Sequence, residues 1–333
     1  MESEIIGHTW ATDVLLRHLR SGATRHAYLM TGAEGVGRST VADWFVRALL
    51  CTSGGGKGPP CGECGACSLI SRGAHPDVHW FEGEGGLKID DVRRLQHELS
   101  LSPYQANRRV AVMPDVEAAT TEAANALLKT LEEPPPNVVL VLTAATEESV
   151  LPTIVSRCEV IALRPMAISD LAKALEARGE PADRARMLAG QAMGRPGLAI
   201  RLSEDAEQVR QRSLLIEDGL RVLGMTRAGR FEYAAEVNHH KEPVDNRKAS
   251  ILVLEAWLSL WRDVLHQVHG VQGQVTFPEF NLDVEKVAAR VDPDQVVVLL
   301  REIENAMRRI ASNANPLLAM ETIMLALPMV QLA

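Results

Sequence analysis

The sequence is poor in aromatic residues and has no excess of positive charge. Phe, Trp and Tyr together make up 4% of its 333 residues, so aliphatic side chains must fill the core. The formal net charge is −8, which argues against tight nucleic-acid binding by this chain alone, because phosphate contacts need a basic surface. The net charge leaves room for a local basic face, or for nucleic acid that is held by a larger assembly.

Long apolar runs are also absent. No segment approaches the roughly 20 apolar residues that span a bilayer, and Met1–Gly7 lacks the pattern of a signal peptide. We expect a cytoplasmic protein with no membrane partner. Hydrophobic residues account for 46% of the chain and charged residues for 23%, as in folded globular proteins, and the length predicts two or three domains.

Cysteine is scarce, and four of the five cysteines gather in one segment. That segment has two overlapping CxxC turns and one cysteine upstream, at Cys51, Cys61, Cys64 and Cys67. Four thiolates predict a closed, structural zinc site, whereas a redox CxxC motif would leave two of them unexplained. His75 is the alternative fourth ligand, but His75-Pro76-Asp77 is typical of a turn that enters a strand. We expect Cys158 to be a buried small residue.

The first half of the chain alternates strand-like and helix-like segments. Short apolar runs predict strands at Ala27–Thr31, Val78–Phe81, Val110–Met113, Val138–Leu142 and Glu159–Leu163. Helical spacing predicts helices over Gly37–Leu50, Ile89–Leu99 and Thr121–Leu131. Strands that alternate with helices of this length predict an α/β domain, with a parallel sheet covered by helices on both faces.

The strand pattern ends at Pro165. Ser169–Arg178 and Ala182–Met193 predict short helices, and the chain from about Ser203 onward is helical, with an apolar stripe at Leu299, Ile303, Met307 and Ile310. We therefore expect a core domain over 1–165, with the metal module at 51–67. A small helical lid over 166–205 and an all-helical domain over 206–333 should follow.

A glycine-rich segment after the first predicted strand has the spacing of a phosphate-binding loop. Its candidate nucleotide-binding residues are Gly32, Gly35, Gly37, Arg38, Ser39 and Thr40. Glycines let backbone N–H groups wrap phosphates at a helix N-terminus. Arg38 stands where the GxxxxGK[ST] pattern has lysine, which is not a conservative exchange, and Glu34 adds a negative charge. We expect a loop that keeps its shape and binds nucleotide weakly or not at all.

The magnesium-binding half of an ATPase site should follow a later apolar strand and needs two carboxylates. The strand that ends at Met113 runs into Pro114-Asp115-Val116-Glu117. If Pro114 and Asp115 fill the two positions, one carboxylate is missing. If Asp115 and Glu117 fill them, both would point to the same side, and the residues alone leave this second register open.

Further sequence blocks follow one another in order along the chain. They are Ile5-Ile6-Gly7-His8, His26-Ala27-Tyr28-Leu29, the Thr121–Pro135 segment with ALLKTLEEPP, and Thr153–Cys158 with Ser156-Arg157-Cys158. With the glycine loop and the cysteine cluster, they resemble the clamp-loader family of AAA+ proteins, strongly over about 1–200. The ALLKTLEEPP and Ser-Arg-Cys blocks are specific to this family, whereas the glycine loop alone is not.

The resemblance implies an AAA+ core, a small helical lid and an all-α C-terminal collar. The collar would assemble with delta-type and gamma/tau-type subunits into a hetero-oligomeric ring, which loads a sliding clamp onto primer-template DNA within a DNA-directed DNA polymerase holoenzyme. The resemblance also places Pro114 in the magnesium position and Asp115 in that of the catalytic Glu. It implies that Arg157 enters the nucleotide site of a neighbouring motor subunit as an arginine finger.

Two functions remain to be compared. The first is a non-hydrolysing subunit that shapes the ring and donates Arg157, and the alternative is an active ATPase motor that uses Arg38 as its phosphate cation. Arg38 and Pro114 favour the first, as does Leu198, where relatives carry a basic sensor residue. Arg195 is basic but lies three positions earlier.

Arg157 and Thr143 each have a simpler structural interpretation besides the functional role. A surface salt bridge is the alternative for Arg157. Within the segment of Arg157 the one acidic candidate partner is Glu159, which would point to the opposite side of its strand, so we expect a free guanidinium. Thr143, at a strand end, is either a polar sensor or an ordinary capping residue.

Overall fold

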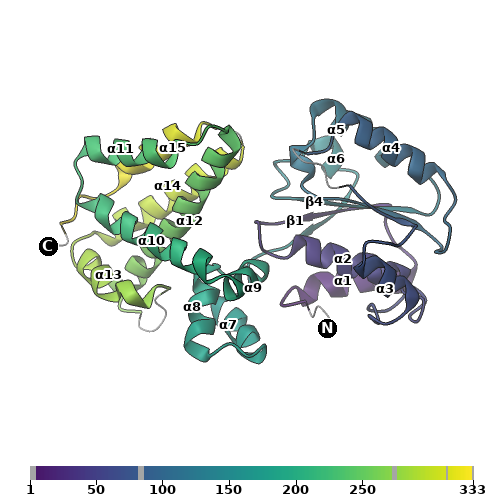
Figure 1. Cartoon of the computed structure of the whole chain (residues 1–333), viewed down its shortest axis with the longest axis horizontal. Coiled ribbons are helices and arrows are strands. Elements are labelled where there is room, and N and C mark those ends of the chain that lie inside the picture. The colour runs from purple at the N-terminus through teal and green to yellow at the C-terminus, as the bar shows by residue number, and fades with distance from the viewer. Residues whose placement is uncertain (1–4, 82–85, 272–275, 313, 332–333) are drawn as a thin grey trace. The chain divides into compact units, whose positions relative to one another are not determined.

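The computed structural model describes residues 5–81, 86–271, 276–312 and 314–331. Its contacts divide the chain into two compact units, Met1–Met166 with Arg195–Gly197, and Ala167–Gly194 with Leu198–Ala333. The first unit is the α/β part and the second is helical (Figure 1). The division into three domains, with a lid that ends near 205, remains a prediction.

A parallel sheet forms the centre of the first unit. Its strands are β1 (Ala27–Thr31), β2 (Val78–Trp80), β3 (Arg109–Met113), β4 (Val138–Ala144) and β5 (Glu159–Ala162), in the order β2-β3-β4-β1-β5. Every residue of β1, β3 and β4 is buried, as expected for the near-continuous apolar strands of a parallel sheet. The predicted parallel sheet is confirmed, although β2 and β5 each end one residue earlier than expected.

Helices cover both faces of this sheet (Figure 1). They are α1 (Thr9–Ser21), α2 (Arg38–Leu50), α3 (Gly65–Ser71), α4 (Ile89–Ser100), α5 (Thr121–Glu132) and the short α6 (Pro152–Val155). Alternate residues of β1 belong to two separate cores: Tyr28 and Met30 pack with α1 and α2, whereas Ala27 and Leu29 pack with α4 and α5. This alternation follows from the two-residue period of a strand.

The second unit contains helices from α7 onward. They are α7 (Ile168–Ala177), α8 (Ala182–Gln191), α9 (Pro196–Glu204, which begins in the first unit), α10 (Ala206–Leu223), α11 (Arg227–Val237), α12 (Pro243–Val268), α13 (Asn281–Ala288), α14 (Pro293–Ala311) and α15 (Pro316–Ala326). Trp257 and Trp261 of α12 are fully buried at the centre of its core. The predicted stripe on α14 faces this core: Leu299, Ile303 and Ile310 are buried, and Met307 packs against them.

A buried arginine joins three helices of the second unit. Arg230 of α11 is 3% exposed, and its guanidinium donates to five backbone carbonyls, those of Val222, Leu223, Met324, Leu327 and Pro328, at 2.7–3.1 Å. These carbonyls lie at the C-terminal ends of α10 and α15, where helices leave acceptors unsatisfied. None of the described helices of the chain is long and apolar enough to cross a membrane.

Candidate functional site

The predicted phosphate loop connects β1 to α2. Gly32, Gly35 and Gly37 have φ angles of 150°, 78° and 112°, which L-residues with side chains rarely adopt. A Cβ on Gly32 would also lie 2.6 Å from the carbonyl oxygen of Leu163, so this position requires glycine. Ser39 and Thr40 follow in the first turn of α2. The chain therefore keeps the backbone of a phosphate loop that leads into a helix N-terminus.

Arg38, the first residue of α2, points towards carboxylates of its own chain. Its Nη2 lies 3.0 Å from Oδ1 of Asp115, and its Nη1 lies 3.8 Å from Oε1 of Glu117. The arginine side chain is 12% exposed, whereas the side chains of Asp115 and Glu117 are 59% and 22% exposed, so a buried cation meets one exposed and one partly buried carboxylate. The cation that would face the phosphates in an ATPase is instead the counter-ion of the two candidate magnesium ligands.

The two carboxylates are oriented by the end of β4. The N–H of Asp115 donates to Oγ1 of Thr143 at 3.1 Å, and Oε1 of Glu117 accepts from the N–H of Ala145 at 2.8 Å. Asp115 has a φ of 46°, in the left-handed region, and Thr143 is 2% exposed. The Thr143 hydroxyl thus caps the turn, and the turn brings Asp115 and Glu117 to the same guanidinium, as the second register requires.

Two basic residues that the sequence interpretation undervalued hold the backbone of the loop. His8 Nε2 lies 2.8 Å from the carbonyl oxygen of Val36, and Arg195 Nη1 donates to that of Glu34 at 3.3 Å. Arg195 is 4% exposed, and Leu198 is 6% exposed in an apolar environment. The basic residue three positions before Leu198 therefore reaches the phosphate loop. The sequence signals were the Ile5-Ile6-Gly7-His8 block and the basic residue Arg195, whose contacts with the loop span 28 and 161 positions.

The cysteine cluster has the geometry of a metal site. Its four sulfur atoms, in Cys51, Cys61, Cys64 and Cys67, all lie within 4.8 Å of one another. The sulfurs of Cys51 and Cys64 are 4.0 Å apart, close to the spacing of about 3.8 Å between thiolates at the corners of a tetrahedron around zinc. The four cysteines could therefore hold a metal ion.

Backbone N–H groups favour the thiolate forms of Cys61 and Cys64, whereas burial raises the pKa of the Cys67 thiol. The N–H of Cys64 donates to the sulfur of Cys61 at 3.3 Å, and that of Cys67 donates to the sulfur of Cys64 at 3.5 Å. Burial alone would raise the pKa of the Cys64 thiol, but hydrogen bonds from Thr52 and Cys67 lower that pKa to about 5. A thiolate is the form that a metal requires.

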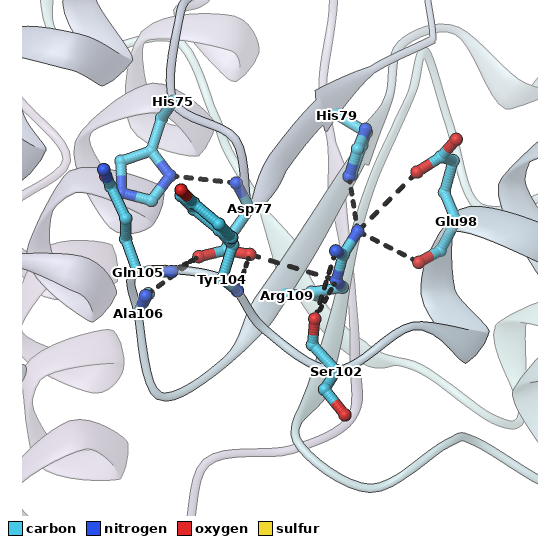
Figure 2. A network of polar contacts seen from close by, with 9 residues as sticks. All are labelled: His75, Asp77, His79, Glu98, Ser102, Tyr104, Gln105, Ala106 and Arg109. Atoms are coloured by element: carbon cyan, nitrogen blue, oxygen red, sulfur yellow. Dashed lines mark hydrogen bonds and ion pairs between the residues drawn. The ribbon is translucent and has the colours of Figure 1, made fainter.

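His75 belongs to a different network, around the buried carboxylate of Asp77 (Figure 2). His75 Nδ1 accepts from the N–H of Asp77 at 3.1 Å, and burial lowers the pKa of this histidine. The Asp77 carboxylate accepts the backbone N–H groups of Tyr104, Gln105 and Ala106 at 2.6–2.8 Å. His75 thus stands at the turn into β2, as its sequence context predicts.

Arg109 completes this network on the other side of Asp77 (Figure 2). Its Nε lies 3.9 Å from the Asp77 carboxylate, and its guanidinium donates to the carbonyl oxygens of Glu98 and Ser102. Burial would raise the pKa of Asp77, but the three N–H donors and Arg109 outweigh it and lower that pKa below its usual range. The network attaches the segment 101–108 to the sheet, and nothing in the local sequence indicated it.

Arg157 lies between α6 and β5, and its guanidinium is not free. Its Nη2 contacts Oε1 of Glu132 at 2.7 Å, and its Nη1 donates to the carbonyl oxygen of Thr153 at 2.8 Å. The expectation of an unpaired guanidinium is therefore wrong, because the partner comes from the end of α5 and not from the same segment. Glu159 pairs instead with Arg25, at 3.6 Å. The neighbouring Cys158 is partly buried, and burial raises the pKa of its thiol to about 12.

Comparison with known proteins shows which family the chain resembles. Residues 7–167 match the family model described as "DNA polymerase III, delta subunit". The chain is 26% identical over 317 residues to DNA polymerase III subunit delta' of Bacillus subtilis, covering 94% of both chains. The chain is similar to DNA polymerase III delta-prime subunits over nearly its whole length. It is also 35% identical over 205 residues to subunit delta' of Pseudomonas aeruginosa, covering 60% of this chain and 61% of that protein.

Other relatives match about half of the chain. DNA polymerase III subunit tau of Escherichia coli is 30% identical over 174 residues, covering 52% of this chain and 27% of the relative. Among solved structures, a DNA polymerase III gamma subunit-related protein of Thermotoga maritima has a TM-score of 0.38 and 20% identity, covering 95% of this chain and 97% of its own. The expected α/β core with a parallel sheet, followed by helices alone, is confirmed. The assignment of those helices to an AAA+ lid and collar stays a prediction.

Proposed function

We propose that the chain is a clamp-loader subunit in DNA replication that does not hydrolyse ATP itself. Its partners are delta-type and gamma/tau-type subunits in a cytoplasmic ring, together with the sliding clamp and primer-template DNA held by the assembly. Its similarity to delta-prime subunits supports the role in replication. The observation behind the proposed lack of hydrolysis is the contact between Arg38 and Asp115 at 3.0 Å.

In the proposed site, magnesium and the γ-phosphate would both compete with the contacts that Arg38 makes to Asp115 and Glu117. Magnesium would have to displace the guanidinium from Asp115 and Glu117, and the γ-phosphate would have to draw the same guanidinium away from both carboxylates. A P-loop lysine avoids this conflict, because it acts as a compact point charge over the phosphates. Hydrolysis also needs carboxylates that are free to hold magnesium and to position water. The chain's own cation thus blocks both requirements.

The second part of the proposal is that Arg157 acts on a neighbouring subunit. A guanidinium has a fixed charge and bidentate donors that suit a transferring phosphoryl group. An arginine finger supplied in trans accelerates turnover by about 10³–10⁵-fold. Support comes from the Ser-Arg-Cys block and from the position of Arg157 at the surface of the core, where its side chain is 34% exposed.

One observation favours the alternative function, an active ATPase motor. Asp115 and Glu117 do lie together beside the phosphate loop, so a carboxylate pair would become available if Arg38 moved. Titration of ATP with Mg²⁺ into the purified chain, followed by calorimetry and by steady-state turnover, separates the two functions. We expect no turnover from the wild type, and none from Arg38→Lys, because Pro114 still stands where the family resemblance places the magnesium-binding carboxylate. Turnover by the purified chain that is lost on changing Arg38 would establish the motor and refute the proposal.

We also propose that Cys51, Cys61, Cys64 and Cys67 hold one structural zinc ion. All four positions of a tetrahedral ion would be filled by thiolates, so the ion would have no open position for chemistry. When bound, it would close the loop between α2 and α3 and supply folding free energy there. Metal analysis of protein purified without chelator tests the assignment, since fewer than one zinc per chain would contradict it.

A further inference from the structure

The proposed finger, Arg157, is held against its own domain by both terminal nitrogens. Nη2 contacts Oε1 of Glu132 at 2.7 Å. Nη1 donates to the carbonyl oxygen of Thr153 at 2.8 Å and to Oγ of Ser156 at 3.3 Å. Glu132 is the last residue of α5, and Thr153 belongs to α6. The side chain therefore folds back over α6 towards the end of α5.

The two nitrogens held in this way are those that a phosphate would need. Bidentate recognition of an oxyanion by arginine uses two parallel N–H donors. Each terminal nitrogen carries two N–H groups, so donors remain, but the contacts of Nη2 with Glu132 and of Nη1 with Thr153 hold the guanidinium against its own domain. To present its parallel donors to a phosphate on a neighbour, the side chain would have to leave these partners, so the two contacts compete for one guanidinium.

We propose that Glu132 is a positioning residue that retains Arg157 on its own domain until a nucleotide triphosphate occupies the neighbouring site. This inference rests on the proposed role of Arg157 as a finger in trans. The single carboxylate of Glu132 competes with a γ-phosphate, which carries more negative charge and more acceptor oxygens. Once the γ-phosphate has left, the guanidinium returns to Glu132. The pair makes engagement of the finger depend on the nucleotide state of the neighbour.

The exposure of the pair sets the size of the effect. The side chains of Arg157 and Glu132 are 34% and 51% exposed, so solvent screens their attraction. Exposed ion pairs of this kind shift an equilibrium by about 1.5- to 5-fold. Such a contact is weak enough for a triphosphate to displace and strong enough to determine where the side chain rests.

The chain offers a matched control. Glu133 is the next residue, is exposed and carries the same charge, but among the described residues it forms no ion pair. Glu132→Gln and Glu133→Gln therefore remove equal charge from neighbouring positions, and only the first alters the partner of Arg157. Arg157→Ala serves as the reference that removes the finger itself.

The experiment measures ATP turnover in a ring reconstituted with the neighbouring motor subunit. We expect Glu132→Gln to lower the apparent KM for ATP by about 1.5- to 5-fold with no loss of kcat, because the finger is released more readily. Glu133→Gln should match the wild type. In the isolated chain, the NMR signal of a rotationally restricted Arg157 guanidinium should weaken in Glu132→Gln and persist in Glu133→Gln.

Each other outcome overturns a specific claim. If Arg157→Ala reduces turnover but Glu132→Gln leaves KM unchanged or behaves as Glu133→Gln does, Glu132 does not retain the finger, and the proposed function stands. A lower kcat in Glu132→Gln would mean that Glu132 supports the active position of the finger. If Arg157→Ala leaves turnover unchanged at every site, the proposed function itself fails.

Discussion

At the scale of single residues, charge pairing decides how the site can act. Arg38 and Arg157 both bind carboxylates of their own chain, but the surroundings differ. The Arg38 side chain is 12% exposed and lies between Asp115 and Glu117, whereas Arg157 is 34% exposed and meets one carboxylate. Asp115 and Glu132 are themselves 59% and 51% exposed, so the difference lies in the burial of the guanidinium and in the second carboxylate that Arg38 meets. We therefore expect the pairing of Arg38 to be exchanged for another anion less readily than that of Arg157.

Replacement of Arg157 by alanine should separate stability from function. We expect a change of about 0–1 kcal/mol in the free energy of unfolding, because exposed ion pairs contribute no more than this. Zinc content and ring assembly should be unchanged. In the reconstituted ring, turnover at the adjoining site should fall by about 10³-fold or more. Denaturant unfolding measures the change in stability, and ATPase assays of single sites measure the change in turnover. If the variant is unfolded to an extent that accounts for the loss of turnover, Arg157 has a structural role only.

At the scale of elements, two short loops depend on side chains and not on regular hydrogen bonding. The cysteine loop between α2 and α3 contains few apolar anchors, and the segment 101–108 rests on the carboxylate of Asp77. Both loops are therefore sensitive to the chemistry of a few atoms. Loss of the cysteine ligands should release the cysteine loop, and loss of the Asp77 carboxylate should release the segment 101–108. The sheet should remain folded in both cases.

Cys64→Ser tests the first loop. A serine hydroxyl is a poor zinc ligand, so we expect the loss of bound zinc and faster amide hydrogen exchange over 51–75, because structural zinc sites contribute folding free energy where they sit. Exchange in α12 and α14 should stay at the wild-type rate. Chelation of zinc from the wild type should reproduce the same pattern, and Cys158→Ser, which alters a cysteine outside the cluster, serves as the control.

Asp77→Asn tests the second loop and predicts a dependence on pH. The folded-state pKa of Asp77 lies below its unfolded value, so its stabilisation is fully present above the unfolded pKa and is lost as pH falls through the folded pKa. At neutral pH the variant should lose about 3 kcal/mol, since hydrogen bonds to a charged acceptor are lost. The difference between variant and wild type should shrink in acid. Urea unfolding at pH 7 and pH 3 checks this, and an equal difference at both would contradict it.

At the scale of the whole molecule, the two compact units are held by different means. The α/β unit has two apolar cores on the faces of one sheet, whereas the helical unit is centred on the tryptophans of α12 and on the buried guanidinium of Arg230. The Arg230 side chain is almost fully removed from water, at 3% exposed, and this burial lowers the pKa of its guanidinium. Hydrogen bonds to five carbonyl oxygens offset the free-energy cost of removing this guanidinium from water.

Arg230→Met should therefore destabilise the helical unit selectively. The methionine fills part of the volume but leaves buried carbonyls without donors, at about 1–3 kcal/mol for each fully buried acceptor. We expect a lower midpoint for unfolding of the helical unit, with zinc binding by the α/β unit retained. Calorimetry combined with metal analysis of the heated protein distinguishes this from global destabilisation. Arg227→Met, on an exposed position of the same helix, is the matched control.

The local features of this protein were determined by its sequence. Buried strands follow from uninterrupted apolar runs, the phosphate loop from glycines that adopt positive φ, and the cysteine cluster from two CxxC turns, because each depends on residues close together in the chain. Tertiary structure alone decided the partners of the long basic side chains. Arg38 meets Asp115, Arg195 meets the loop across 161 positions, and Arg157 meets Glu132 across 25. These pairs form because strand ends and helix ends converge in space, which no local pattern encodes.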